Sequence, residues 1–153
     1  MRSAKLDRNT KETKIKISLN LDGVGKTDVK TDNAFFDHLL NSFAFHGRIN
    51  LEIQVNSKTG AGSHHLVEDI GLMLGKTLDK ALGERVGITR FGNIIIPMDD
   101  ALILVSLDLS GRVYFKSNLT FRYSEIEGLS SEMIDHFFKS FSEGGRLNLH
   151  IKC

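Results

Sequence analysis

The segment HHLVED at residues 64–69 combines imidazole and carboxylate side chains at spacings that suit a metal ion. His64 and Glu68 are four residues apart, so in a helix they lie one turn apart on the same face. His65 and Asp69 repeat this spacing on the adjacent face, and an imidazole and a carboxylate so placed can share one divalent cation. Because adjacent helical residues point about 100° apart, the two histidines favour two ions over one. A solvated helix start, with acidic residues favoured by the helix dipole, explains an isolated segment of this kind about equally well.

A second candidate is an Asp-His pair that occurs twice, as Asp37-His38 and as Asp135-His136. Each pair comes early in a segment with helical periodicity. A lone histidine in such a place usually packs or caps a helix, whereas two at equivalent places in a repeat favour pseudo-symmetric metal ligands. Together with the first motif they give a nitrogen-rich ligand set with a hard oxygen, which suits Mn, Fe, Zn or Ni without choosing among them.

Two arginines lie beside glycines, a setting that suits a phosphate group. Arg90 occurs in TRFG and Arg112 in SGR, where the guanidinium can pair with two phosphate oxygens and glycine lets the backbone approach. For either arginine alone, a surface salt bridge is the commoner role. Glu12 has the chemistry of a general base, as any exposed glutamate on a strand does. His46 is expected to end a helix.

Hydrophobic periodicity predicts the elements that must position these residues. Alternation with period two favours strands, and apolar residues spaced by three and four favour helices. The predicted strands cover residues 13–21, 49–55, 92–97, 101–109, 112–117 and 147–151. The predicted helices cover residues 34–45, 64–82 and 130–142. Asn33 is the N-cap expected for the first helix, and Ser130 or Ser131 is expected to cap the third.

The pattern repeats within the chain. Residues 35–55 align without gaps with residues 133–153, and nine of these 21 positions are identical. The period is too long for a solenoid. Two copies of a strand–strand–helix–strand–helix unit are therefore predicted, as an α+β chain with halves at residues 1–86 and 87–153.

The repeat also predicts where its second copy should continue. The counterpart of His64 would lie 26 residues after His136, at about position 162, beyond Cys153. The second half is therefore expected to be incomplete within these 153 residues. Such a half would expose apolar surface unless another chain covers it.

Composition restricts the partners and the compartment. The net charge of +1 gives no overall field that would recruit nucleic acid or an anionic membrane. The sequence shows neither a signal peptide nor an apolar run long enough to span a bilayer. Cys153 is the only cysteine, so a disulfide within the chain is impossible and a reducing, cytoplasmic location is expected.

Several of these segments, taken in order, resemble the imidazoleglycerol-phosphate dehydratase family from residue 8 to residue 151. They are RNTKET, LDGVGK, FFDHLLNSFAFHG, HHLVEDIGLMLGKTL, GITRFGNIIIPMDDAL, LDLSGR and DHFFKSF. The resemblance implies an α+β fold of two tandem pseudo-symmetric halves, each a sheet with helices packed on one face, like domain 2 of ribosomal protein S5. It also implies a homo-oligomer of 24 subunits with active sites at the subunit interfaces.

The resemblance further implies two manganese ions per site, although other divalent transition metals suit the same ligands. One ion would be held by His64, Glu68 and His136, and the other by His38 and His65. The implied catalytic residues are Glu12, His38, His65 and Glu68. The substrate would contact Glu12, His38, His46, His64, Arg90 and Arg112, with the two arginines on its phosphate.

The implied reaction removes water from imidazole glycerol phosphate, a small phosphorylated imidazole, to give imidazole acetol phosphate in L-histidine biosynthesis. The family carries a second HHxxE motif on its last helix. The repeat places the equivalent helix of this sequence beyond Cys153. Part of the family's ligand set would therefore be absent from these 153 residues. The alternative is a catalytically inactive, truncated family member that acts as a structural or assembly subunit. A metal hydrolase is disfavoured because no nucleophile or second carboxylate base accompanies the HHxxE segment.

Overall fold

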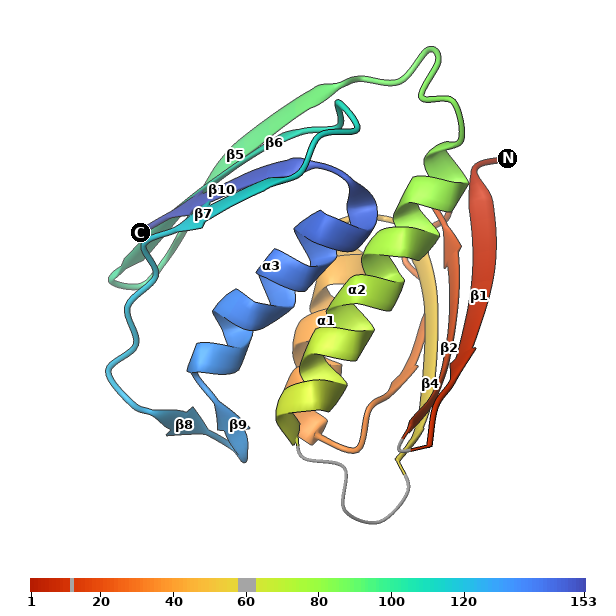
Figure 1. Cartoon of the computed structure of the whole chain (residues 1–153). Helices are drawn as coiled ribbons and strands as arrows, with labels where there is room; N and C mark the ends of the chain where they lie inside the picture. Colours follow the sequence, from red (N-terminus) through yellow and green to blue (C-terminus); the bar gives the residue numbers. More distant parts are fainter. Residues whose placement is uncertain (12, 58–62) are drawn as a thin grey trace.

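The computed structural model describes residues 1–11, 13–57 and 63–153, apart from the side chains of residues 63 and 64. Within these residues, two four-stranded sheets enclose a layer of three helices (Figure 1). The helices are α1 (Ala34–His46), α2 (Ser63–Leu82) and α3 (Glu132–Gly145). The predicted α+β architecture with two sheet-containing halves is confirmed.

The first sheet has the strand order β1-β2-β4-β3, in which only the β3–β4 pair is parallel. Its strands are β1 (Ser3–Asn9), β2 (Thr13–Asn20), β3 (Thr27–Lys30) and β4 (Asn50–Ser57). The alternation that predicted β2 and β4 places Ile15, Ile17 and Ile53 on the inner face, where each is fully buried. α1 and α2 cover this inner face and complete the larger apolar core.

The second sheet repeats this arrangement with the order β5-β6-β10-β7, in which the β7–β10 pair is parallel. Its strands are β5 (Phe91–Met98), β6 (Ala101–Asp108), β7 (Tyr114–Ser117) and β10 (Asn148–Lys152). Leu19 pairs with Leu51 in the first sheet, and Leu107 pairs with Leu149 in the second. The repeat read from the sequence is therefore also a repeat of strand register.

Each four-stranded sheet has three strands that precede the first helix of its half, not the two that the predicted repeat unit contained, and the second half adds the separate β8–β9 hairpin. Periodicity missed β1 and β3, as well as the small hairpin of β8 (Glu125–Ile126) and β9 (Leu129–Ser130). β1 carries charged side chains along an edge of the sheet, and β3 is only four residues long. Charged edges and short strands weaken the apolar alternation on which such predictions depend. The halves predicted at residues 1–86 and 87–153 meet between α2 and β5, and their status as separate domains stays a prediction.

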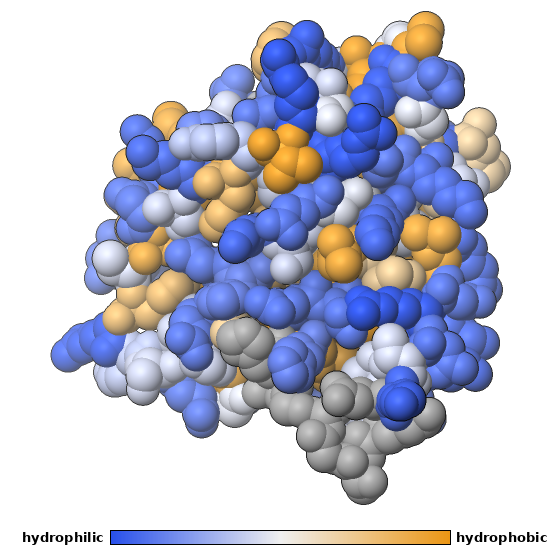
Figure 2. Space-filling view, viewed as in Figure 1, coloured by the Kyte–Doolittle hydropathy of each residue, from blue (hydrophilic) through white to orange (hydrophobic). Residues whose placement is uncertain are grey.

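The two sheets differ in how their edge strands are covered. α2 packs on β1 and β2 of the first sheet. In the described part of the chain no helix covers β5 in this way, and Ile94, Ile95 and Ile96 are each more than half exposed. Figure 2 shows apolar side chains exposed between polar ones on the face of the molecule that carries α2 and α3. None of the helices described is both long and apolar enough to cross a membrane.

The two helices that carry the Asp-His pairs begin differently. Asn33 caps α1 as predicted, because its side chain accepts a hydrogen bond of 2.8 Å from the amide of Phe36. Asp37 in the first turn accepts hydrogen bonds from the amide and hydroxyl of Thr31, at 2.8 and 2.6 Å. Ser131 occupies the N-cap position of α3 but does not cap it, since its hydroxyl donates instead to the carbonyl of Tyr123. A serine thus stands at the predicted N-cap position, but its side chain does not make the capping hydrogen bond.

Candidate metal and substrate site

The predicted ligands Glu68 and His136 meet at the contact between α2 and α3. These helices lie side by side and run in the same direction, with their first turns at the same end (Figure 1). The Nδ1–H of His136 donates to Oε1 of Glu68 across 2.7 Å. Both side chains are roughly one-third to two-fifths exposed, so a small ligand from solvent can reach them. A carboxylate from one repeat and an imidazole from the other are thus brought to one point.

The neighbouring carboxylate, Asp69, is used to hold α2 on the first sheet. It forms an ion pair with Arg8 of β1, and the hydroxyl of Thr13 on β2 lies 3.5 Å from its second oxygen. Glu68 is therefore the carboxylate of the HHLVED segment that points away from the sheet and toward α3. This division explains why the two adjacent acids of the motif have different roles.

The second Asp-His pair leaves one acceptor without a donor. The oxygen Oδ1 of Asp135 is buried and has no hydrogen-bond partner among the described residues. Its repeat counterpart Asp37 has both the amide and the hydroxyl of Thr31. A buried carboxylate oxygen without a donor costs free energy. A buried acceptor without a donor, next to His136 in sequence, is expected where a polar site lacks one of its partners.

α1 begins near the same place. The rings of Phe36 and Phe137 make an edge-to-face contact with centroids 5.4 Å apart. Phe36 lies two residues before His38, and Phe137 directly follows His136. His38 and His65 are exposed within the first two turns of α1 and α2. Among the described side chains, no group of three possible ligands closes around one point. Glu12 and the side chain of His64 lie outside the described residues.

The two predicted phosphate arginines lie at the opposite end of the helices. Arg85, just after α2, donates to the carbonyls of Leu109 and Arg146, each at 3.0 Å, so this region lies at the C-terminal ends of α2 and α3. The amide of Leu109 donates to the carbonyl of Arg90, and Arg112 follows three residues later. From Glu68 to the end of α2 there are 14 residues, roughly 20 Å along the helix axis.

The predicted residues therefore fall into two groups within one subunit. The exposed His46 is the last residue of α1, which places it at the end of that helix away from His38. The first two turns of the helices carry His38, His65, Glu68 and His136, and the distant group contains Arg90 and Arg112. One subunit by itself does not bring the arginines to the Glu68–His136 pair.

Arg90 forms a two-pronged ion pair in this structure. Its Nε and Nη2 donate to the two carboxylate oxygens of Asp108 at 2.6 and 3.0 Å. Hydrogen bonding from Arg90 is the main cause that lowers the pKa of Asp108 below its ordinary value, and Ser110 and Arg112 add to it. Arg112 is exposed beside this pair. Two cationic side chains near one turn can bind a phosphate, although Arg90 would have to share its guanidinium with Asp108.

We expect the carboxyl group of Asp108 to titrate below the ordinary aspartate value of about 3.9. Because the pKa is lowered in the folded state, the pair stabilises the fold above that ordinary value and stops doing so as the pH falls through the lowered pKa. Carboxyl carbon NMR of the wild type and of Arg90→Met checks this. The midpoint for Asp108 should rise in the variant, and an unchanged midpoint would mean that Arg90 does not hold the carboxylate in solution.

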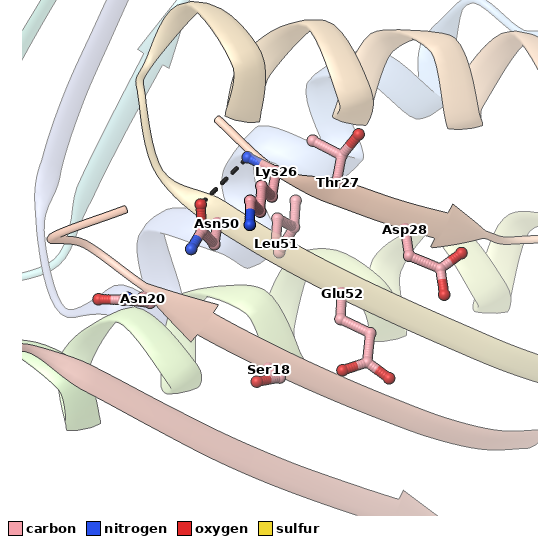
Figure 3. Close-up of a pocket in the computed structure, with 8 residues that line it drawn as sticks. All are labelled: Ser18, Asn20, Lys26, Thr27, Asp28, Asn50, Leu51 and Glu52. Carbon is pink, nitrogen blue, oxygen red and sulfur yellow. Dashed lines mark hydrogen bonds between the residues drawn. The ribbon is translucent and has the colours of Figure 1, made fainter. Parts of the chain in front are cut away.

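A hollow on the outer face of the first sheet is a less suitable candidate site (Figure 3). The side chain of Asn50 fixes the backbone at one edge of this hollow, since its Oδ1 accepts hydrogen bonds from the amides of Val24 and Lys26 at 2.9 and 3.1 Å. The hollow lies on the side away from the helices and is lined by Ser18, Asn20, Lys26, Thr27, Asp28, Asn50, Leu51 and Glu52. These mixed polar groups do not converge on one point in Figure 3.

Sequence reasoning missed two interactions that frame the site. Arg8 lies in the RNTKET segment, which indicated no such contact, and Arg85 lies in a segment without a motif, yet each forms an ion pair with an aspartate of α2. Arg85 has a left-handed backbone conformation, with φ of 56°, in the turn after α2. A single arginine after a helix is too common to predict such a contact.

Comparison with known proteins points to one family. The model of the imidazoleglycerol-phosphate dehydratase family matches residues 31–153. An imidazoleglycerol-phosphate dehydratase of Streptococcus mutans is 45% identical over 152 residues, which cover 99% of this chain and 78% of that protein. The same enzyme of Methanococcus maripaludis is 46% identical over 152 residues, covering 99% of this chain and 79% of that protein.

Solved structures give the same result. A crystal structure of the enzyme from Pyrococcus furiosus in complex with (S)-C348 superposes with a TM-score of 0.82 and 37% identity. That match covers 96% of this chain and 78% of the Pyrococcus chain. The structure of the enzyme from Staphylococcus aureus gives a TM-score of 0.85 and 28% identity, over 98% of this chain and 82% of the other.

Proposed function

The chain belongs to the imidazoleglycerol-phosphate dehydratase family, whose members are hydro-lyases of histidine biosynthesis, and we propose that it performs this dehydration with bound manganese. The substrate is imidazole glycerol phosphate and the product is imidazole acetol phosphate. The single observation that carries the metal assignment is the meeting of Glu68 and His136, 2.7 Å apart, from equivalent halves of the chain.

The donor set fits a divalent cation. Glu68 supplies a carboxylate oxygen and His136 a ring nitrogen, and together these favour a first-row transition metal such as Mn²⁺. We propose that His64 completes this set, and that His38 and His65 hold a second ion. The buried Oδ1 of Asp135, which lacks a donor among the described residues, is a second sign of a polar site that binding completes. Bound cations at this place would polarise the imidazole ring of the substrate.

The chain's own residues would then bind the substrate and move its proton. The proton to be removed sits on a carbon beside the imidazole ring and is weakly acidic, so a positioned base is needed. We assign this role to the carboxylate of Glu12, which takes that proton and can return one to the departing hydroxyl. Arg90 and Arg112 bind the phosphate, and His46 contacts the substrate.

This assignment requires more than one subunit. Within a subunit, Arg90 and Arg112 lie roughly 20 Å along α2 from Glu68, farther than a small phosphorylated imidazole can reach. If a second copy places its Arg90 and Arg112 near the N-terminal ends of α2 and α3, one substrate can contact both the arginines and Glu68. We therefore propose a homo-oligomer with active sites at its subunit interfaces, built from 24 subunits. We place it in the cytoplasm.

The purified chain should be assayed for loss of water from imidazole glycerol phosphate, first after removal of metals with EDTA and then with added Mn²⁺. We expect activity only with the added metal, together with a large assembly by light scattering. As a control, Glu52→Gln changes a carboxylate in the hollow on the outer face, away from the proposed site, and should keep full activity with Mn²⁺. A well-folded, fully assembled protein that stays inactive with Mn²⁺ would contradict the proposal and support a structural subunit.

A further inference from the structure

Contacts between glycines and backbone atoms determine how closely α2 and α3 approach. A Cβ added at Gly71 would lie 2.6 Å from the carbonyl oxygen of Phe137. A Cβ added at Gly75 would lie 2.5 Å from the amide nitrogen of Gly145 and closer still to the carbonyl oxygen of Phe141. These neighbours are main-chain atoms of a helix, which cannot rotate away as a flexible side chain would. An added methyl group would therefore move the helices apart.

The contact is reciprocal, which fixes the register of the pair as well as its separation. A Cβ at Gly144 of α3 would lie 3.0 Å from the amide nitrogen of Lys76 and closer to the carbonyl oxygen of Leu72. Each helix thus places a glycine against the main chain of the other. A slide along the axis would bring side chains into these gaps.

The predicted metal ligands lie at the end of this same contact. Glu68 is three residues before Gly71, and Gly75 is four residues after it, so all three share one face of α2. On α3, His136 immediately precedes Phe137, whose carbonyl faces Gly71. The hydrogen bond between Glu68 and His136 therefore lies one turn from the Gly71–Phe137 contact.

We propose that Gly71 is a positioning residue for the metal site, because its contact with the backbone of Phe137 sets the separation at which Glu68 meets His136. The inference rests on the proposed function only where it assigns Mn²⁺ to that pair. Metal–ligand bonds of about 2.0–2.2 Å tolerate little displacement, so a helix shift of about 1 Å removes one of the two ligands. Gly75 has the tighter contact but lies a turn farther from the ligands. A comparison of the two glycines therefore distinguishes an effect on ligand position from an effect on helix packing.

The test compares Gly71→Ala with Gly75→Ala in the full chain. The dissociation constant for Mn²⁺ alone is measured by titration calorimetry, and the melting temperature is measured without metal. We expect Gly71→Ala to weaken Mn²⁺ binding by about 10–100-fold. Gly75→Ala should weaken binding less, although it should lower the melting temperature at least as much. Equal losses of affinity, or the larger loss in Gly75→Ala, would overturn the inference.

A second variant keeps the test usable if Gly71→Ala does not fold. A Cβ at Gly71 would lie 3.3 Å from the Cβ of Ser140, so Ser140→Thr adds a methyl group to the same gap from α3. This change leaves the glycine in place and should also weaken Mn²⁺ binding. Wild-type affinity in a folded Ser140→Thr protein would contradict the positioning role.

A metal-free measurement separates this inference from the proposed function. Glu68→Gln, His136→Gln and the double variant give the coupling between the two side chains in unfolding experiments without metal. The coupling should be lost in the Gly71→Ala background, or in Ser140→Thr if the former does not fold. A retained coupling refutes the positioning role. A lost coupling in a chain whose wild type binds no Mn²⁺ refutes the metal assignment and leaves the positioning role standing.

Discussion

Glu68→Gln should lower kcat for dehydration by about 10²–10³-fold, with a matching loss of Mn²⁺ affinity. Glutamine has nearly the same shape as glutamate and still accepts a hydrogen bond from His136, so the packing of α2 on α3 should persist. It carries no charge and is a poor ligand for a hard cation, however. The result is measured by steady-state kinetics and by Mn²⁺ titration of the same preparation.

The control for this variant is Asp69→Asn, which neutralises the adjacent acid on α2. Asp69 is paired with Arg8, so its loss should reduce stability more than it reduces Mn²⁺ affinity. If Asp69→Asn abolished metal binding while Glu68→Gln left it intact, the two carboxylates would have been assigned the wrong roles.

Arg85→Met should lower the free energy of unfolding by about 3 kcal/mol. The Arg85 side chain is only 14% exposed, and it forms an ion pair with Asp79 of α2. It also donates to the carbonyls of Leu109, Gly145 and Arg146 at 2.8–3.0 Å. Methionine would retain part of the aliphatic packing but leave these acceptors without their donor. Urea denaturation of wild type and variant gives the difference directly.

Lys80→Met is the matched control for Arg85→Met. Lys80 is exposed in the last turn of α2, and its substitution should change stability by less than about 0.5 kcal/mol. Arg85 joins the ends of α2 and α3 to the turn after β6, so its loss should loosen the region that carries Arg90 and Arg112. Equal stabilities of the Arg85 and Lys80 variants would show that this network contributes little.

Much of the fold followed from the sequence because its strongest signals are local. The alternation in β2 and β4 reports directly which side chains are buried, and the predicted boundaries of α1 and α2 agree with the structure within one residue. The internal repeat then predicted two halves with the same order of elements, and the structure has two four-stranded sheets of equivalent strand order. β1 and β3 were missed because charged residues on an edge strand and a length of four residues carry little apolar pattern.

The metal ligands of the candidate site stay a prediction, and the arrangement of the candidate residues could not be predicted from the sequence. Helical spacing and the repeat each marked one of Glu68 and His136 as a candidate, whereas their grouping came only from the family resemblance; the structure places them 2.7 Å apart. The separation of Arg90 and Arg112 from that pair depends on the direction in which α2 and α3 run, which no local pattern records. The close approach at Gly71 and Gly75 was likewise invisible, because glycine in a helix has no periodic signature of its own.

A crystal structure of the full chain grown with Mn²⁺, with anomalous scattering collected at the manganese edge, tests the central claim most directly. The proposal predicts an anomalous peak about 2.0–2.5 Å from a carboxylate oxygen of Glu68 and from a ring nitrogen of His136, in place of the direct hydrogen bond between them. A saturated crystal in which that 2.7 Å hydrogen bond persists, with manganese bound elsewhere or not at all, would contradict it.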